Sequence, residues 1–268
     1  MSQEQLLTGI KAISKMAGEV ILAVYNRNES IKVSNKEDNS PLTEADLAAH
    51  QIIISELKKL TPGIPVLSEE SATISWEERQ TWTRYWLVDP LDGTKEFINR
   101  NGEFTVNIAL IDEHVPVLGV VYIPVTKTLY SGGLGLGAFR EENGKEIRIQ
   151  VKDTKLDEAA KIVASRSHRG EELDRWLEKV GKSFPAVELL SMGSSLKICL
   201  VAEGAADIYP RLALTSEWDT AAAQAVLEAA GGTLLDVDFR VYRYNLKEDI
   251  LNPYFFAIGD KSFNWQSL

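Results

Sequence analysis

The sequence predicts a mixed fold of the α+β and α/β classes, and three patterns in this chain of 268 residues predict it. Apolar residues recur at helical spacing over the first segment, Gln3–Tyr25. Strand-like runs separated by turn residues follow between Phe104 and Ser131, as in an antiparallel meander. From Ile162 to Ala230 strands and helices alternate, which is typical of α/β structure. The chain therefore combines antiparallel and alternating segments.

Two helices are expected near the N-terminus. The segment Gln3–Tyr25 is amphipathic, and its apolar face consists of Leu6, Ile10, Ile13, Ala17, Val20, Ile21 and Val24. A second helix follows Pro41, with Thr43 as its N-terminal cap, and its apolar side continues to Leu60. Pro62 and the glycine after it end that helix. Both helices are predicted to pack against the core.

Three strands are expected in the middle of the chain: Phe104–Ile111, Val115–Tyr122 and Thr128–Ser131. The glycines at Gly132–Gly133 and Gly135–Gly137 favour tight hairpin turns. A nucleotide-binding loop is the alternative, but the cluster lacks the lysine and the hydroxyl of a P-loop and precedes no clear helix. The glycines are therefore assigned to turns.

The polar stretch Glu141–Lys161 separates the meander from the alternating half. We place a boundary near residue 156, which gives an N-terminal half of residues 1–155 and a C-terminal half of residues 156–268. The expected elements of the second half are Ile162–Ser165, Glu171–Val180, Val187–Leu190, Ser195–Ala202, Ala206–Tyr209 and Trp218–Ala230. The connection is too short for the halves to tumble independently.

Composition narrows the classes of function. A formal net charge of −10 opposes binding to nucleic acid, which needs basic residues, whereas a small phosphate ester bridged by a metal remains compatible. The single cysteine, Cys199, is predicted to be a small core residue and not a catalytic thiol. His50, His114 and His168 show no zinc spacing. Without an export signal or a long apolar segment, a cytoplasmic location is expected.

Acidic residues stand where a buried strand gives way to a turn. Leu87–Val88 is predicted to end a strand covered on both faces, because Pro90 withholds an amide donor from the ladder. Asp89 and Asp92 flank that proline, and Gly93–Thr94 is typical of a helix start whose free amides attract an anion. A simple Asp-Gly chain reversal is the alternative for this motif.

Further acidic residues favour a ligand-binding site over a simple chain reversal. Glu69–Glu70 follows Ile64–Leu67, a second short apolar strand, and Asp219 precedes the alanine-rich helix Ala221–Ala230. Asp219 taken alone could be a helix cap. Together these residues indicate a cation that prefers oxygen ligands, next to a phosphate site.

Three acidic motifs, Ser68–Glu70, Asp89–Thr94 and Trp218–Ala222, resemble in order and spacing those of the inositol monophosphatase-like, lithium-sensitive metal phosphatases. Within that superfamily the chain is similar to the bacterial 3′(2′),5′-bisphosphate nucleotidases, and further segments support this branch: Lys95–Phe97, Asn101–Asn107, Ser165–His168, Gly193–Lys197 and Leu251–Pro253. One departure is Ala223, where the family usually has glycine.

The resemblance implies a layered α-β-α-β-α sandwich with the site between its halves. It also implies two or three Mg²⁺ ions, with these ligands: Glu69, Asp89, the Leu91 carbonyl, Asp92 and Asp219. By the same likeness Glu70 positions a water at the metal, while Asp46 and Thr94 orient and deprotonate the attacking water. No covalent phosphoenzyme is required in such a mechanism.

The resemblance further implies a set of substrate-binding residues: Gly93, Thr94, Ser165, His168, Gly193, Ser194, Lys197 and Arg211. Lys197 and Arg211 are candidates for holding a second phosphate, for which the arginine fork is well suited. The alternatives are that Lys197 lies on a solvated helix face and that His168 caps a loop.

The expected activity is removal of the 3′-phosphate of adenosine 3′,5′-bisphosphate to give AMP, with possible action on its activated-sulfate derivative and a role in sulfate assimilation. An inositol or sugar monophosphatase and a non-catalytic nucleotide sensor are the alternatives. The expected partner is thus a small nucleotide bisphosphate. The sequence leaves open the oligomeric state, the choice between 2′- and 3′-phosphates, and attachment to the cytoplasmic face of the inner membrane.

Overall fold

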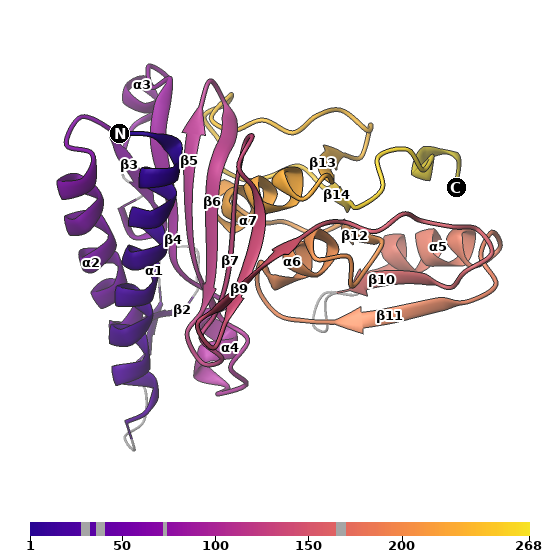
Figure 1. The fold of residues 1–268 in the computed structure, drawn as a ribbon, viewed down its shortest axis with the longest axis horizontal. Helices are drawn as coiled ribbons and strands as arrows, with labels where there is room; N and C mark the ends of the chain where they lie inside the picture. Colours follow the sequence, from indigo (N-terminus) through magenta and orange to yellow (C-terminus); the bar gives the residue numbers. More distant parts are fainter. Residues whose placement is uncertain (28–32, 36–40, 72–73, 165–169) are drawn as a thin grey trace.

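Helices and sheets lie in five successive layers, as the resemblance implied (Figure 1). The structure, a computed structural model, describes residues 1–27, 33–35, 41–71, 74–164 and 170–268. A helix pair covers a seven-stranded sheet, two further helices lie between that sheet and a five-stranded one, and a last helix covers the outer face. The predicted α-β-α-β-α sandwich is confirmed.

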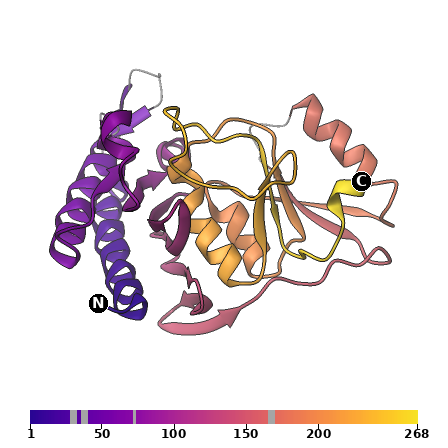
Figure 2. The same ribbon diagram turned by 90° about the horizontal axis from the view of Figure 1, so that it is seen from above.

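The outer helix pair is formed by α1 (Gln3–Tyr25) and α2 (Glu44–Leu60), which pack on each other and on the first sheet (Figure 2). Both helices have the predicted bounds. Thr43 caps α2 in a reciprocal capping box with Asp46. A short hairpin of β1 (Val33–Asn35) and β2 (Pro41–Thr43) precedes α2.

The first sheet has the strand order β3-β4-β5-β6-β7-β8-β9. Its strands are β3 (Val66–Ser68), β4 (Arg84–Asp92), β5 (Thr105–Asp112), β6 (Val115–Ile123), β7 (Thr128–Gly133), β8 (Gly137–Glu142) and β9 (Lys145–Ile149). β3 and β4 are parallel, and each later strand pairs antiparallel with the one before it; β5, β6 and β7 are the three strands of the predicted meander. The prediction missed β8 and also β9, which lies within the supposed polar separator and is exposed at four of its five residues. The assignment of Gly132, Gly133 and Gly137 to turns was wrong, because these glycines belong to β7 and β8 and the turn between the strands is formed by residues 134–136.

The end of β4 differs from the prediction. Pro90 does not stop the strand, which continues to Asp92 through a register shift against β5 between Asp89 and Asp92. A bulge lets a strand contain a proline, because the irregular position needs no ladder bond from the missing amide. The register shift also lets Asp89 and Asp92 face the same side at this end of the sheet.

The second sheet has the order β11-β10-β12-β14-β13. Its strands are β10 (Ala160–Ala164), β11 (Val187–Ser191), β12 (Ile208–Arg211), β13 (Thr233–Asp236) and β14 (Phe255–Ile258). On its outer face α5 (Glu171–Val180) packs Trp176 against Phe256, with ring centroids 5.7 Å apart. The boundary near residue 156 falls between β9 and β10 and stays a prediction.

The middle layer consists of α6 (Leu196–Ala202) and α7 (Glu217–Ala229). Two glycines let α7 lie close to the first sheet: a Cβ at Gly119 would collide with the Ala222 carbonyl, and one at Gly132 would lie 2.8 Å from the Val226 Cα. Ala223 is fully buried in this layer. Because α7 packs closely on the first sheet, the N-terminus of this helix lies at the end of β4.

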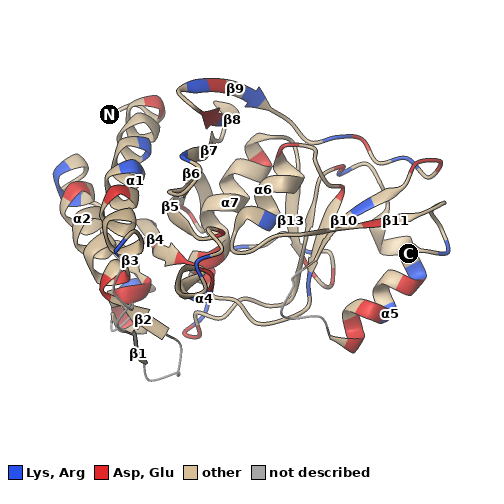
Figure 3. Ribbon diagram, turned by 90° about the horizontal axis from the view of Figure 1, so that it is seen from below, with Lys and Arg blue, Asp and Glu red and all other residues tan. Residues whose placement is uncertain are grey.

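Among the described residues, the helices include none with the length and apolar character needed to cross a bilayer. Basic residues are scattered among acidic ones (Figure 3). Short helical turns complete the fold: η1 (Glu69–Ser71), α3 (Trp76–Arg79), α4 (Thr94–Ile98) and η2 (Trp265–Ser267).

Candidate active site

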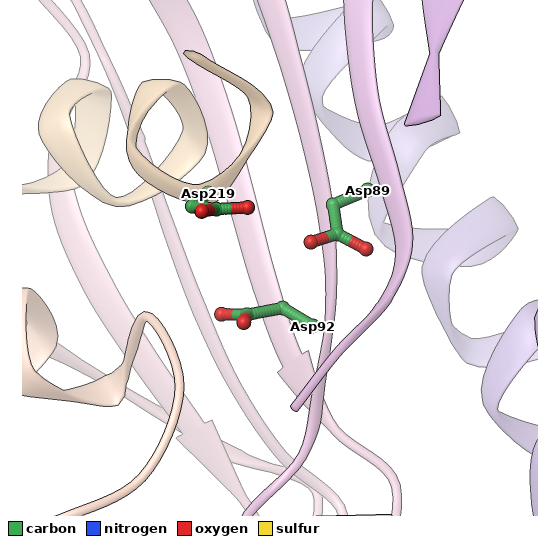
Figure 4. A group of neighbouring side chains, drawn as sticks. All are labelled: Asp89, Asp92 and Asp219. Atoms are coloured by element: carbon green, nitrogen blue, oxygen red, sulfur yellow. The ribbon is translucent and has the colours of Figure 1, made fainter. Parts of the chain in front are cut away.

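Three aspartates converge where the two halves of the chain meet (Figure 4). Asp89 and Asp92 come from the end of β4 and Asp219 from the first turn of α7. Each offers a carboxylate oxygen, and these oxygens lie within 4.8 Å of one another. The structure thus brings together acids that are more than a hundred residues apart in sequence.

Asp219 is held by the helix that carries it. Ser216 is the N-cap of α7, and its backbone N–H donates to Asp219 Oδ2 over 2.8 Å in a capping box. Asp219 therefore occupies the third position of the helix and is not itself the cap, which was the structural alternative for this residue. One carboxylate oxygen is fixed to the backbone, so the side chain has a defined direction.

The two glutamates follow from strand pairing. β3 is parallel to β4, so Glu69 and Glu70 in η1 emerge at the same edge of the sheet as Asp89. Glu69 is hydrogen-bonded to Asp89, and its charge acts on both Asp89 and Asp219. Glu70 is partly buried in the same turn. The predicted grouping of acids at this edge therefore includes Glu69.

The electrostatics of the cluster are unfavourable without a cation. Burial, followed by the charges of Glu69, Asp92 and Asp219, raises the pKa of Asp89 well above its usual range. Burial and then Asp92 likewise raise the pKa of Asp219. The buried carboxylate of Asp89 and the partly buried ones beside it repel one another and form an all-oxygen donor set of the kind that hard divalent cations occupy. The residues present therefore fit a metal site.

Millimolar Mg²⁺ is expected to raise the melting temperature. A ligand that binds only the folded state at a hundred times its Kd stabilises it by about 2.7 kcal/mol, which for a chain of this size corresponds to roughly 5–10 °C. Differential scanning fluorimetry across a Mg²⁺ series, with K⁺ at matched ionic strength as control, measures the shift. Equal curves in both salts would contradict a preformed site.

A hydroxyl and a buried carboxylate lie beside the cluster. Thr94 Oγ1 donates to Asp46 Oδ1 at 3.2 Å and lies 3.4 Å from the Leu91 carbonyl oxygen. Asp46 is 1% exposed, and its second oxygen accepts from the Thr43 backbone N–H over 2.8 Å. Gly93, which precedes Thr94, has φ of 92°, a conformation that glycine adopts readily. This φ turns the chain so that Thr94 faces Asp46.

A cavity of about 440 Å³ opens next to the aspartates. Residues from both halves line it, among them five of the predicted substrate-binding residues: Gly93, Gly193, Ser194, Lys197 and Arg211. Asp92 and Asp219 form its metal-side wall. The predicted residues Ser165 and His168 lie outside the described residues.

Lys95, Lys197 and Arg211 line this cavity, and of these Lys95 is exposed to solvent. Lys197 is buried, which contradicts the alternative of a solvated helix face, and its Nζ donates to the Ser194 carbonyl over 2.7 Å. Burial lowers the pKa of Lys197 to about 8. Arg211 donates from Nη2 to the Leu214 carbonyl over 3.0 Å, while its buried Nε has no hydrogen-bond partner among the described residues. An unsatisfied buried donor beside a cavity favours an anionic ligand.

Sequence reasoning gave no role to Ser195 or Asn107, which contact Asp92, and assigned Ser194 to substrate binding alone. Oδ2 of Asp92 accepts hydrogen bonds from Ser194 Oγ and from the Ser195 N–H, each over 2.6 Å. Asn107 Nδ2 lies 3.4 Å from the same oxygen. The signal available in the sequence was the alternation of polar residues at Glu103, Thr105 and Asn107, at the start of an otherwise apolar strand.

Comparison with known proteins defines the class to which this fold and site belong. The model of the inositol monophosphatase family matches residues 2–256, so the chain belongs to that family. It is 49% identical over 250 residues to the 3′(2′),5′-bisphosphate nucleotidase CysQ of Salmonella typhimurium, covering 93% of this chain and 98% of that protein. The CysQ of Escherichia coli K12 is 50% identical over 250 residues, which again cover 93% of this chain and 98% of that protein.

A solved structure supports the same placement. The crystal structure of CysQ from Bacteroides thetaiotaomicron, a bacterial member of the inositol monophosphatase family, matches with a TM-score of 0.83 at 43% identity. The match covers 96% of this chain and 97% of that one. The chain thus resembles CysQ proteins along nearly its whole length in both sequence and fold.

Proposed function

We propose that the protein is a metal-dependent phosphatase that removes the 3′-phosphate of adenosine 3′,5′-bisphosphate, giving AMP and inorganic phosphate. The observation that carries this proposal is the shared cavity, which is lined both by Asp92 and Asp219 of the carboxylate cluster and by the basic side chains of Lys197 and Arg211. A bisphosphate presents one phosphate to each. The CysQ relatives, by their names, act on 3′(2′),5′-bisphosphate nucleotides.

The ligand set proposed for the metal consists of Glu69, Asp89, Asp92, Asp219 and the carbonyl of Leu91. We propose Mg²⁺, in two or three positions, as the physiological cation because the donors are all oxygen. Bound divalent ions supply Lewis acidity at phosphorus and make water easier to deprotonate. The chain's own contribution is to hold these oxygens at fixed places, as the capping box of Asp219 does.

Thr94 and Asp46 are proposed to prepare the attacking water. The Thr94 hydroxyl donates its proton to Asp46 Oδ1, so its lone pairs face outward and can accept a proton from the water. As that proton arrives, the hydroxyl proton passes to Asp46 Oδ1, which is kept in place by the bond from Thr43 to Oδ2. Glu70 is proposed to orient a second water.

The second phosphate is proposed to bind Lys197 and Arg211. The space between the two phosphates is proposed to be lined by Gly93, Thr94, Gly193 and Ser194. Ser165 and His168 remain proposed substrate contacts on the resemblance alone. Hydrolysis of the activated-sulfate derivative and a role in sulfate assimilation are part of the same proposal.

A phosphate-release panel tests this function. Adenosine 3′,5′-bisphosphate, its activated-sulfate derivative, inositol 1-phosphate and fructose 1,6-bisphosphate are compared with Mg²⁺, Ca²⁺ and added Li⁺. We expect the nucleotide bisphosphate to have the highest kcat/KM, with no release in EDTA. Preference for inositol or sugar phosphate would replace the proposal by a monophosphatase, and nucleotide binding without release would replace it by a sensor.

Replacing Arg211 with alanine is expected to raise the KM for adenosine 3′,5′-bisphosphate by about 10- to 100-fold, because charge-assisted hydrogen bonds contribute about 1.5–3 kcal/mol. The KM for adenosine 3′-monophosphate, which lacks the second phosphate, should hardly change. Arg243→Ala is the matched control, since Arg243 also donates to a backbone carbonyl but does not line the cavity. Equal increases with both substrates would remove Arg211 from the second-phosphate site.

The kcat/KM for the bisphosphate is expected to fall as pH rises through about 8. Because burial lowers the pKa of Lys197 to about 8, the side chain is charged below that pH and neutral above it, and a neutral amine binds phosphate weakly. Lys197→Met should have a lower kcat/KM at pH 7 and lack this decline. A wild-type profile that stays level from pH 7 to 9.5 would rule out the charged role of Lys197.

A further inference from the structure

Three polar side chains of the first half contact one loop of the second half. Thr105 and Asn107 alternate at the start of β5 and therefore point to the same face of the sheet, and Glu103 lies two residues before the strand. We call them the polar ladder. They meet the loop Gly193–Ser195, which leads into α6 and lines the cavity.

The ladder and the loop match one another residue by residue. The Gly193 N–H donates to Glu103 Oε2 over 2.7 Å, and Ser195 Oγ donates to Asn107 Oδ1 over 2.9 Å. Thr105 Oγ1 is hydrogen-bonded to Ser194 Oγ at 2.6 Å and lies 3.0 Å from Ser195 Oγ. Thr105 and Asn107 are 0% and 1% exposed. The hydrogen bond between Ser195 and Asn107 is thus shielded from water, and the loss of a partner from a buried hydrogen bond is costly.

The loop in turn fixes Asp92. Ser194 Oγ has one proton, which it donates to Asp92 Oδ2, so the Thr105 hydroxyl must donate to Ser194. The Ser195 N–H donates to the same carboxylate oxygen. Thr105 therefore acts on Asp92 through Ser194, with two hydrogen bonds of 2.6 Å in sequence.

The backbone around Glu103 also joins the two halves. A Cβ at Gly193 would lie 2.9 Å from the Glu103 carbonyl oxygen, and one at Gly93 would lie 3.3 Å from the same atom. Both glycines thus pack on one peptide group. Ser194 has φ of 55°, in the left-handed region that residues other than glycine seldom adopt. Contacts on both sides of Ser194 hold it in this conformation.

We propose that the polar ladder is a positioning device that couples the nucleotide-binding loop to the metal ligand Asp92, so that metal binding and nucleotide binding strengthen each other. This inference rests on the proposed function of the cavity. A nucleotide in the cavity would lie against Ser194 and Ser195 and favour the conformation in which these residues hold Asp92 in the direction that a cation needs. By linkage, a cation at Asp92 then favours the loop conformation that binds nucleotide.

Isothermal titration calorimetry tests the coupling without turnover. The Kd of Mg²⁺ is measured alone and with saturating AMP, which carries no phosphate at the 3′ position. In the wild type we expect AMP to lower the Kd of Mg²⁺ by about 5-fold or more. In Thr105→Val, Mg²⁺ alone should bind about 10-fold more weakly, as is usual when a residue that supports a metal ligand is lost. AMP should no longer change the Kd of Mg²⁺ in this variant.

Two further variants separate positioning from folding. Thr105→Ser keeps the hydroxyl and should restore both the Mg²⁺ affinity and the coupling. Thr128→Val removes another buried strand hydroxyl, bonded to Thr126, and should leave both at wild-type values. Coupling that persists in Thr105→Val would overturn the proposal, as would its absence from a wild type that binds both ligands. A wild type that binds neither ligand would instead overturn the proposed function.

Discussion

Replacing Asp89 with asparagine is expected to reduce kcat by about 10³-fold or more while raising the melting temperature of the metal-free protein. The loss follows because a metal ligand that is worth several kcal/mol in the transition state disappears, and each 1.36 kcal/mol is tenfold in rate. Asparagine can still accept the 3.0 Å hydrogen bond from the Leu91 N–H, so the turn should keep its shape.

The gain in stability has an electrostatic cause. Because burial and the neighbouring carboxylates raise the pKa of Asp89, the metal-free protein loses stability as pH rises from the unfolded value of about 3.9 towards that raised pKa. Asparagine does not ionise and removes this contribution. Stopped assays and thermal melts with and without Mg²⁺ measure both effects.

Asp112→Asn is the control for this experiment, since Asp112 ends the neighbouring strand β5 at the opposite edge of the sheet and pairs with Arg84 on the surface. It should change neither kcat nor the Mg²⁺ response. Near-normal turnover of Asp89→Asn in excess Mg²⁺ would remove Asp89 from the ligand set.

Replacing Thr94 with valine is expected to reduce kcat by about 10²- to 10³-fold with little change in KM, because the proton path from water to Asp46 Oδ1 is interrupted. Valine has nearly the same volume as threonine. Unlike Asp89→Asn, this variant should retain the full Mg²⁺-dependent rise in melting temperature, because its carboxylates are intact.

Thr94→Ser provides the comparison, since it restores a hydroxyl at the same place and should recover most of the rate. If Thr94→Val turned over at the wild-type rate, the water would have to be activated without this hydroxyl. If the variant also lost its response to Mg²⁺, Thr94 would be supporting the metal site and not the proton transfer.

Much of the fold could be predicted because local signals and tertiary structure agree. The apolar periodicity and the capping residues determined the bounds of α1 and α2, and the strand-like runs located β5, β6 and β7. Asp89 and Asp92 were recognisable because they stand beside Gly93, at the end of a strand buried on both faces.

Other features depend on contacts that no local pattern contains. β9 is an edge strand exposed at four of five residues, so it lacks the apolar alternation by which strands are recognised. Pro90 stays in β4 only because β5 tolerates a register shift beside it. Nothing in the sequence indicated that Gly119 lets α7 pack closely on the first sheet. That close packing brings Asp219 to the other acids.

The central claim is that carboxylates from both halves of the chain hold divalent cations at one place. Crystals grown with Mn²⁺, which also binds oxygen ligands, test it by anomalous diffraction. We expect anomalous peaks between Asp89, Asp92 and Asp219, and their loss or displacement in Asp89→Asn. Ordered Mn²⁺ elsewhere on the protein, with no peak among these three carboxylates, would contradict the account.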